Sequence, residues 1–585
     1  MNRIYILFFM LLFIGPIPLG SFAQKNETVW FDGLARSYFA RDVIGETLEQ
    51  DTLSAKNASN GYNLVDLNTH INPIENIEIF AQLRIKNQFG SFFGSGTSID
   101  VRQLTAKGTI KNKVRFSIGD IYLKQNRFTL FNYNEDLSSY ENNMFKSYRD
   151  IIHYENFYTQ NRWRLQGLQT DFSFEFDRFI RTLEVDFFIT RPRGSTALSN
   201  TTYSSDLLLS GGTILSKLNK KLTLEGNYIN LFELPSSGTT NISVNNPVYH
   251  SALTYLGNSK NANFKHTLQS GFSERNWLHS ELPNGASDST SNSTEGLFFE
   301  FENEYFKNDS TLKITLGYRY VDPNFRSAGA QSRRLNFLPE NTNTIYPMYT
   351  NSSLTRPRSI FDLLTDETLY NQDISSNLMV FNPIYSNVLP YGDATPNRNG
   401  IYLKSQLSTK RKTLVSIINS GFFREVIGQG TAYRRNFILL KGAVKFNIHK
   451  IFSWEKQMSL SVSSENEITN RLGDSIESLN LNSHQINVFL STEIARKLFL
   501  QFAFKQFYAN GKEFLTQRDN YGNITNFVLT NFDQKDQLIS AGISYMLREN
   551  VYANIQYNWW GMSFNDQAYP NYNYRRLLFI LSVKL

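Results

Sequence analysis

The chain consists largely of segments in which apolar and polar residues alternate. Between Leu312 and Tyr320, apolar side chains occupy every second position, and Lys, Thr, Gly and Arg occupy the positions between them. The segments that begin at Ile77 and at Ile539 follow the same rule. A period of two places successive side chains on opposite faces of an extended strand. The pattern therefore predicts strands that have one apolar and one polar face.

This alternation continues to the end of the chain and predicts about 22 strands. Their expected positions are 28–40, 63–73, 77–89, 99–110, 114–130, 162–174, 180–193, 203–218, 222–234, 247–259, 263–277, 295–307, 312–325, 398–411, 413–428, 432–450, 458–473, 479–497, 498–514, 535–550, 551–564 and 573–585. Tight turns such as 111–113 and 308–311 alternate with long connections such as 131–161 and 326–397. Short periplasmic turns and longer outer loops are typical of bacterial outer-membrane barrels.

The fold class that we predict is all-β, a large transmembrane antiparallel β-barrel. The expected number of strands is about 22, and the turn pattern is compatible with about 18 to 24. Aromatic residues at segment ends, such as Tyr318, Tyr557 and Trp559, fit the interfacial girdles of such barrels. Soluble β-sandwiches also alternate, but they rarely sustain strands this long over so much of a chain. A secreted solenoid or adhesin is the alternative to the barrel.

The first residues have the layout of a targeting segment. Arg3 precedes an apolar run at 4–14, and Ser21-Phe22-Ala23 forms a small-residue cleavage site. This layout predicts a secretory signal peptide at 1–23 that is cleaved after crossing the inner membrane. The remainder, 24–585, is then expected to be a single barrel domain.

The final segment predicts how the barrel assembles. Apolar residues recur at every second position up to the last residue, and an open sheet edge in lipid would leave backbone groups unpaired. We expect this strand to close the sheet and to be recognised by the barrel-assembly machinery. The assembly residues of this strand are Phe579, Leu581, Val583 and Leu585.

Composition excludes several function classes. The chain has no cysteine, which excludes disulfides, thiolate zinc sites and cysteine nucleophiles. Its 59 Lys and Arg residues exceed its 52 Asp and Glu residues by only seven, without a basic tract. Nucleic-acid binding is therefore not expected. The seven His residues show no metal-ligand spacing, and no nucleophile, phosphate or dinucleotide motif is present. We expect no enzyme activity, cofactor or metal ion.

The chain resembles outer-membrane β-barrel proteins of the Bacteroidota. The resemblance lies in a signal peptide that ends in Ala-Gln, strands rich in Asn, Tyr and Phe, and a barrel-type last strand. Triplets that begin at Asp51, Asp288, Asp309 and Asp474 are similar to the O-glycosylation sequon of that phylum. The resemblance implies the outer membrane of a Gram-negative cell, with lipid and lipopolysaccharide as surroundings. A TonB-dependent receptor is not expected, because strands begin soon after Gln24.

The predicted barrel is too wide for its own side chains to fill. About 22 strands spaced 4.8 Å apart close to a diameter on the order of 40 Å, and barrels of this size normally contain a plug. The segment 326–397 is the longest connection and contains apolar clusters at 359–364 and 378–383. We expect it to fold into the lumen and constrict it; an external cap over the barrel mouth is the alternative.

Charged residues supply the candidate lumen site. Acidic residues recur along two predicted strands, and basic residues occur on a third strand and on the long connection, where they could pair with the acidic row. An ordinary polar lumen wall is the favoured interpretation of the acidic rows, because polar lumens are usual in such barrels. The candidate lumen and constriction residues are Glu184, Asp186, Glu300, Glu302, Glu304, Arg319, Arg333, Arg334, Arg356 and Arg358.

Two function classes remain. The first is a porin-like or substrate-selective channel through which a solute, not identified by the sequence, crosses the outer membrane. The second is a non-enzymatic scaffold that binds a protein partner in an envelope machine for secretion or surface-protein assembly. A channel predicts conductance and a continuous lumen, whereas a scaffold predicts a blocked lumen and partners that co-purify.

Overall fold

The computed structural model describes most of the chain after the predicted signal peptide. The described residues are 28–44, 56–89, 96–111, 113–133, 144–177, 180–194, 196–197, 203–204, 206–234, 240–281, 288–331, 344–345, 355–356, 374, 378, 384, 387–428, 430–474, 476–518, 524–564 and 571–585.

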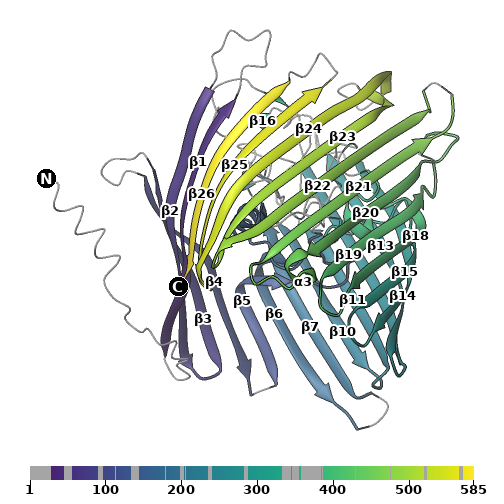
Figure 1. Ribbon diagram of the computed structural model, residues 1–585. Helices are drawn as coiled ribbons and strands as arrows, with labels where there is room; N and C mark the ends of the chain where they lie inside the picture. The colour runs from purple at the N-terminus through teal and green to yellow at the C-terminus, as the bar shows by residue number, and fades with distance from the viewer. Residues whose placement is uncertain are drawn as a thin grey trace.

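The described residues form one antiparallel sheet of 22 strands that closes on itself (Figure 1). The strands of this barrel are β1 (Val29–Ile44), β2 (Lys56–Ile74), β3 (Ile77–Gln88), β4 (Thr97–Ile110), β5 (Val114–Leu123), β6 (Trp163–Glu175), β7 (Thr182–Arg193), β10 (Leu207–Lys217), β11 (Leu222–Glu233), β12 (Thr240–Asn258), β13 (Ala262–Glu281), β14 (Asp288–Lys307), β15 (Leu312–Val321), β18 (Arg398–Ser408), β19 (Leu414–Arg424), β20 (Asn436–Asn447), β21 (Met458–Arg471), β22 (Leu479–Ala495), β23 (Leu498–Arg518), β24 (Ile524–Arg548), β25 (Val551–Phe564) and β26 (Tyr572–Lys584). The prediction of a large antiparallel barrel of about 22 strands is confirmed, and each predicted strand overlaps one of these.

Smaller elements lie between the barrel strands. Two two-residue ladders pair β8 (Thr196–Ala197) with β9 (Tyr203–Ser204) and β16 (Thr344–Ile345) with β17 (Thr355–Arg356). The described helices are α2 (Lys146–Glu155), α3 (Ile448–Ile451) and the 3₁₀ turn η4 (Gly392–Ala394).

The two ends of the barrel differ in the length of their connections. At one end, hereafter the turn end, strands are joined by short segments such as 308–311 and 496–497. At the other, the loop end, the longest connections are 124–162 and 322–397. The short connections match the turns that the sequence predicts. Both long connections lie at the loop end, so they enter the barrel from the same end.

The outer surface of the barrel is apolar. On β15, the outward Leu316 is 52% exposed, whereas its neighbour Thr315 faces inward and is 5% exposed. On β24, Ile539 and Ile543 are likewise exposed, and Ser540 between them is buried inside. An apolar exterior around a polar interior is the surface of a membrane-spanning barrel. Among the described residues, no helix is long and apolar enough to cross a membrane.

The first and last strands complete the ring. β26 pairs with β1 in antiparallel register from Leu34–Lys584 to Ile44–Tyr574, and the two strands lie side by side in Figure 1. Across this seam, Arg576 donates two hydrogen bonds to the carboxylate of Asp42, at 2.5 and 2.6 Å, and both side chains are buried. The predicted assembly residues alternate in step with Leu577, which is exposed on the outer face. Phe579, Leu581 and Val583 pair with β1. The backbone N–H of Leu585 donates to the backbone carbonyl of Gly33 at 2.9 Å.

A charge on the lipid face should impair assembly. We expect Leu316→Arg to cost about 2–4 kcal/mol, because the guanidinium would lie in hydrocarbon. The matched control is Gln406→Arg on the adjacent strand, because Gln406 has the inward phase. The free energy of unfolding in lipid vesicles measures both. Equal losses in the two variants would show that the assignment of the faces is wrong.

The seam should depend on its buried ion pair. Arg576→Ala leaves the Asp42 carboxylate buried without its cation, and breaking such a pair costs about 3–5 kcal/mol. The double variant Asp42→Ala/Arg576→Ala removes both charges and should recover much of that loss. Urea titration of the refolded barrel measures the difference, and a double variant as unstable as Arg576→Ala would contradict this account.

Candidate functional site: the lumen and its two insertions

Both long connections contribute residues to the inside of the barrel. The first insertion, 124–162, places Phe128 in a buried cluster with Phe298, an inward-facing residue of β14. Their rings stack with centroids 4.0 Å apart. The second insertion, 322–397, places Val388 in a buried cluster with Tyr402 and Phe437 on the inner wall. Parts of both insertions therefore lie against the lumenal face of the sheet.

The helix of the first insertion covers the seam of the barrel. α2 has three buried residues, Tyr148, Ile151 and Ile152. They pack against inward-facing residues of β1, β2 and β26, namely Tyr38, Ala40, Tyr62, Leu64, Leu578 and Ile580. The apolar face of a short helix is thus buried on the wall at the place where the first and last strands meet.

The C-terminal residue of α2 is tied to the wall by an ion-pair cluster. Glu155 accepts a hydrogen bond from Arg36 at 3.0 Å and pairs with Arg84. Arg84 also forms a bidentate pair with Asp66, with both distances 2.8 Å. Arg102 lies 3.2 Å from Asp66 and 3.7 Å from Glu155. These partners come from β1 to β4, so the cluster fixes the end of α2 relative to four neighbouring strands.

Electrostatics keeps Glu155 ionised. Burial by itself raises the pKa of a carboxyl group. At Glu155 the hydrogen bond and charge of Arg84, together with the charges of Arg102 and Arg36, outweigh burial and lower the pKa below its ordinary value of 4.5. The ion pairs that tie α2 to the wall are therefore fully formed at neutral pH.

A second cluster joins the two insertions to each other and to the wall. Arg127 of the first insertion pairs with Glu300, with Glu302 at 3.0 Å, and with Asp393 of the second insertion at 3.5 Å. Arg319 on β15 lies 2.8 Å from both Glu300 and Asp393. Two arginines thus form ion pairs with three carboxylates where the insertions meet the sheet.

The charges of this second cluster also shift the pKa values of its members. Burial opposes the charged form of Asp393, but the charges of Arg319, Lys404 and Arg127 hold its pKa well below the ordinary value. The pKa of Arg127 is well above its ordinary value despite burial, chiefly because of Glu300 and Asp393. A buried charge that lost its partner would be costly, so these groups hold the insertions in register with the wall.

The predicted site residues are distributed over three regions. Glu300, Glu302 and Arg319 meet in the second cluster, whereas Glu304 pairs with Lys313 at 2.8 Å nearer the turn end. Glu184 and Asp186 line a separate cavity. Arg333, Arg334 and Arg358 lie outside the described residues, as do all of 359–364 and all of 378–383 except position 378. Only the backbone of Arg356 is described.

Sequence reasoning missed the first insertion. The expectation named 326–397 alone as the segment inside the lumen, whereas 124–162 also packs on the inner wall. Its apolar residues Tyr148, Ile151 and Ile152, followed by Glu155, have helical spacing, which was the available signal. No local sequence signal identifies Arg127, because its partner Glu300 is 173 positions away.

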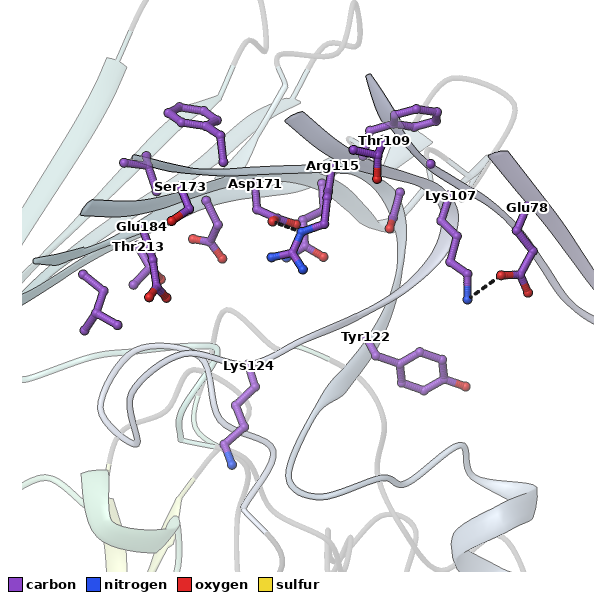
Figure 2. Close-up of a pocket in the computed structure, with 18 of the residues that line it drawn as sticks. Glu78, Lys107, Thr109, Arg115, Tyr122, Lys124, Asp171, Ser173, Glu184 and Thr213 are labelled. Carbon is purple, nitrogen blue, oxygen red and sulfur yellow. Dashed lines mark hydrogen bonds and ion pairs between the residues drawn. The ribbon is translucent and has the colours of Figure 1, made fainter. Parts of the chain in front are cut away.

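A polar cavity of about 1310 Å³ remains open beside the first insertion. On one side, Figure 2 shows wall residues such as Arg115 with Asp171, 2.5 Å apart, and Lys107 with Glu78, 3.1 Å apart. Lys124 of the first insertion lies on the other side in the same view. Because the cavity reaches residues of the β2–β3 turn, it extends to the turn end of the barrel.

These features define a class of protein: a large membrane-spanning barrel whose lumen is partly occupied by two insertions beside a polar cavity. No protein-family model and no curated protein matches the chain.

Solved structures resemble the chain weakly over its whole length. OccK8 (OprE) of Pseudomonas aeruginosa is 11% identical, with a TM-score of 0.34 over 95% of this chain and 98% of that one. OccAB4 of Acinetobacter baumannii is 8% identical, with a TM-score of 0.30 over 96% and 99%. The translocation pore of the P pilus usher PapC is 7% identical, with a TM-score of 0.31 over 94% and 100%. These likenesses are too weak to indicate a function.

Acid should release the first insertion. Because the pKa of Glu155 is lowered in the folded protein, its ion pairs stabilise the docked helix above about pH 4.5 and weaken as pH falls through the lower folded value. The chain has no cysteine, so Lys146→Cys provides a unique site on α2 for a nitroxide label. We expect the label to stay immobile between pH 7 and 5 and to gain mobility at lower pH.

The matched variant is Lys146→Cys/Glu155→Gln. It lacks the titrating carboxylate, so the label should already be more mobile at pH 7 and should change less with pH. Identical pH profiles in the two proteins would show that Glu155 does not hold the helix.

Proposed function

We propose that the protein is a porin-like channel in the outer membrane of a Gram-negative bacterium, and that the two insertions constrict its lumen. The observation that carries this proposal is the polar cavity of about 1310 Å³ inside an apolar exterior. A lumen lined by charges, amides and hydroxyls is stable when water fills it, and water-filled lumens conduct polar solutes.

The chemistry of the cavity favours small hydrophilic solutes. Its wall presents the neighbouring residues Asp171, Asp186 and Thr213 on β6, β7 and β10, in register across the sheet. Opposite them lie Lys124 and Arg162 of the first insertion. A solute that passes between these surfaces would exchange hydration for side-chain hydrogen bonds, which is how channels of this kind select.

The fixed position of the insertions supports constriction rather than free diffusion. Each insertion is held by a buried cluster, around Glu155 in one case and around Arg127 and Asp393 in the other. These clusters hold protein mass in a bore that side chains of the wall cannot fill. Within 326–397, residues 387–397 contribute to this mass on the β18–β21 side.

Single-channel recording combined with cysteine labelling tests the proposal. The purified protein should conduct in planar bilayers. In Thr213→Cys, a charged, membrane-impermeant methanethiosulfonate reagent should reduce the unitary conductance stepwise, because this residue lines the cavity. The control is Leu316→Cys on the lipid face, where the same reagent should leave the conductance unchanged.

Absence of conductance in a folded barrel would overturn the channel proposal and favour the scaffold for an envelope machine. Conductance that Thr213→Cys labelling does not alter would place the ion path elsewhere in the lumen.

A further inference from the structure

A second cavity, of about 760 Å³, lies between α2 and the wall on the side of the barrel away from the polar cavity. We call it the helix cavity. Its lining residues come from α2 and from the inner faces of β1 and β20 to β26. Asn447, His449 and Lys584 line it beside the short connections, so it lies toward the turn end. The volume falls within the range of about 300–1,000 Å³ that is common for small-molecule sites.

More of the surface of the helix cavity is apolar than polar, which is unusual for the lumen of a barrel. Inward-facing positions normally carry polar side chains because they meet water. Here the wall presents aromatic, aliphatic and thioether side chains to the cavity, and α2 adds the aliphatic side chain of Ile151. These residues are Leu34, Ile151, Met458, Phe489, Phe499, Met546 and Ile580.

The edge of the helix cavity is cationic. Lys445 and Lys584 line it and form no ion pair within the described part of the chain. Asp150 is the single carboxylate among the described lining residues, and it already pairs with Lys146. The guanidinium of Arg36 is likewise engaged with Glu155. Two ammonium groups at the end of an apolar pocket thus remain available to an anion.

We propose that the helix cavity binds a small amphipathic anion, a molecule with an apolar body and one anionic head group. The body would replace water against Phe489, Phe499 and Ile580, and the head group would pair with Lys445 or Lys584. A neutral analogue would lack the charge contact, and a cationic analogue would be repelled. The polar cavity is different, because its lining mixes carboxylates with basic residues.

This inference goes beyond the proposed channel function and does not depend on it. Binding to the helix cavity requires a folded barrel but no conducting path. The two proposals can therefore fail separately.

Calorimetric titration of the protein in lipid nanodiscs tests the charge requirement. The probes share one apolar body: 4-phenylbutanoate, 4-phenylbutan-1-ol and 4-phenylbutylammonium. We expect saturable binding of the anion, binding of the alcohol that is at least about tenfold weaker, and none of the cation. Empty nanodiscs supply the baseline for partitioning into lipid. Equal affinities for anion and alcohol, or no heat beyond the baseline, would overturn the proposal.

Two kinds of variant locate the site. Lys445→Gln/Lys584→Gln should weaken binding of 4-phenylbutanoate about tenfold and leave the alcohol unaffected. Lys450→Gln is the matched control, because Lys450 lies on α3 and does not line the cavity. Ser491→Phe places a large side chain in the cavity, beside Ser459 of the adjacent strand. It should abolish binding without a change in charge.

Heat-modifiable electrophoretic mobility, the difference in migration between unheated and heated samples, shows whether each variant still forms the barrel. The lysine variants are conservative in size, so they keep the proposal falsifiable if Ser491→Phe does not fold. Unchanged anion binding in the lysine variants would place the anion elsewhere.

Discussion

Closure of the sheet is the constraint on which the rest of the structure depends. In hydrocarbon an unpaired backbone amide has no water to bond with, so a spanning sheet cannot keep a free edge. β1 and β26 meet this requirement through continuous pairing from Leu34–Lys584 to Ile44–Tyr574. The buried pair of Asp42 and Arg576 adds a charge contact that only the correct register forms. α2 then covers the inner side of the same seam.

Closing 22 strands creates a bore that must be partly filled, and the insertions fill it by forming contacts with the wall. Each insertion brings a largely buried carboxylate whose cationic partners lie on the wall. Glu155 pairs with Arg36 and Arg84, and Asp393 pairs with Arg319. A buried ion pair contributes little net stability over an apolar contact, but a missing partner is costly. Such clusters therefore fix the position of an insertion, because any other position would leave a buried charge without its partner. This is the property that a constriction of defined shape requires.

The strands could be predicted from sequence because lipid on one side and water on the other impose a period of two. For 551–564 the predicted and observed bounds agree, whereas β24 begins at Ile524 rather than at 535. In that extension Phe527, Val528 and Leu529 are consecutive and all exposed, so the alternation fails. The lumen clusters could not be predicted, because the contact of Arg127 with Glu300 joins positions 173 apart and no local pattern encodes it.

The first insertion forms part of the lining of both cavities, through Lys124 in the polar one and through α2 in the other. A displacement of α2 away from the wall would therefore change the shape of the helix cavity, so the position of α2 and a ligand in that cavity would influence each other. Coupling of this kind is reciprocal: a ligand that favours one position of the insertion is itself favoured by that position. The first insertion thus lines both cavities, while its two anchors, Glu155 and Arg127, lie on different parts of the wall.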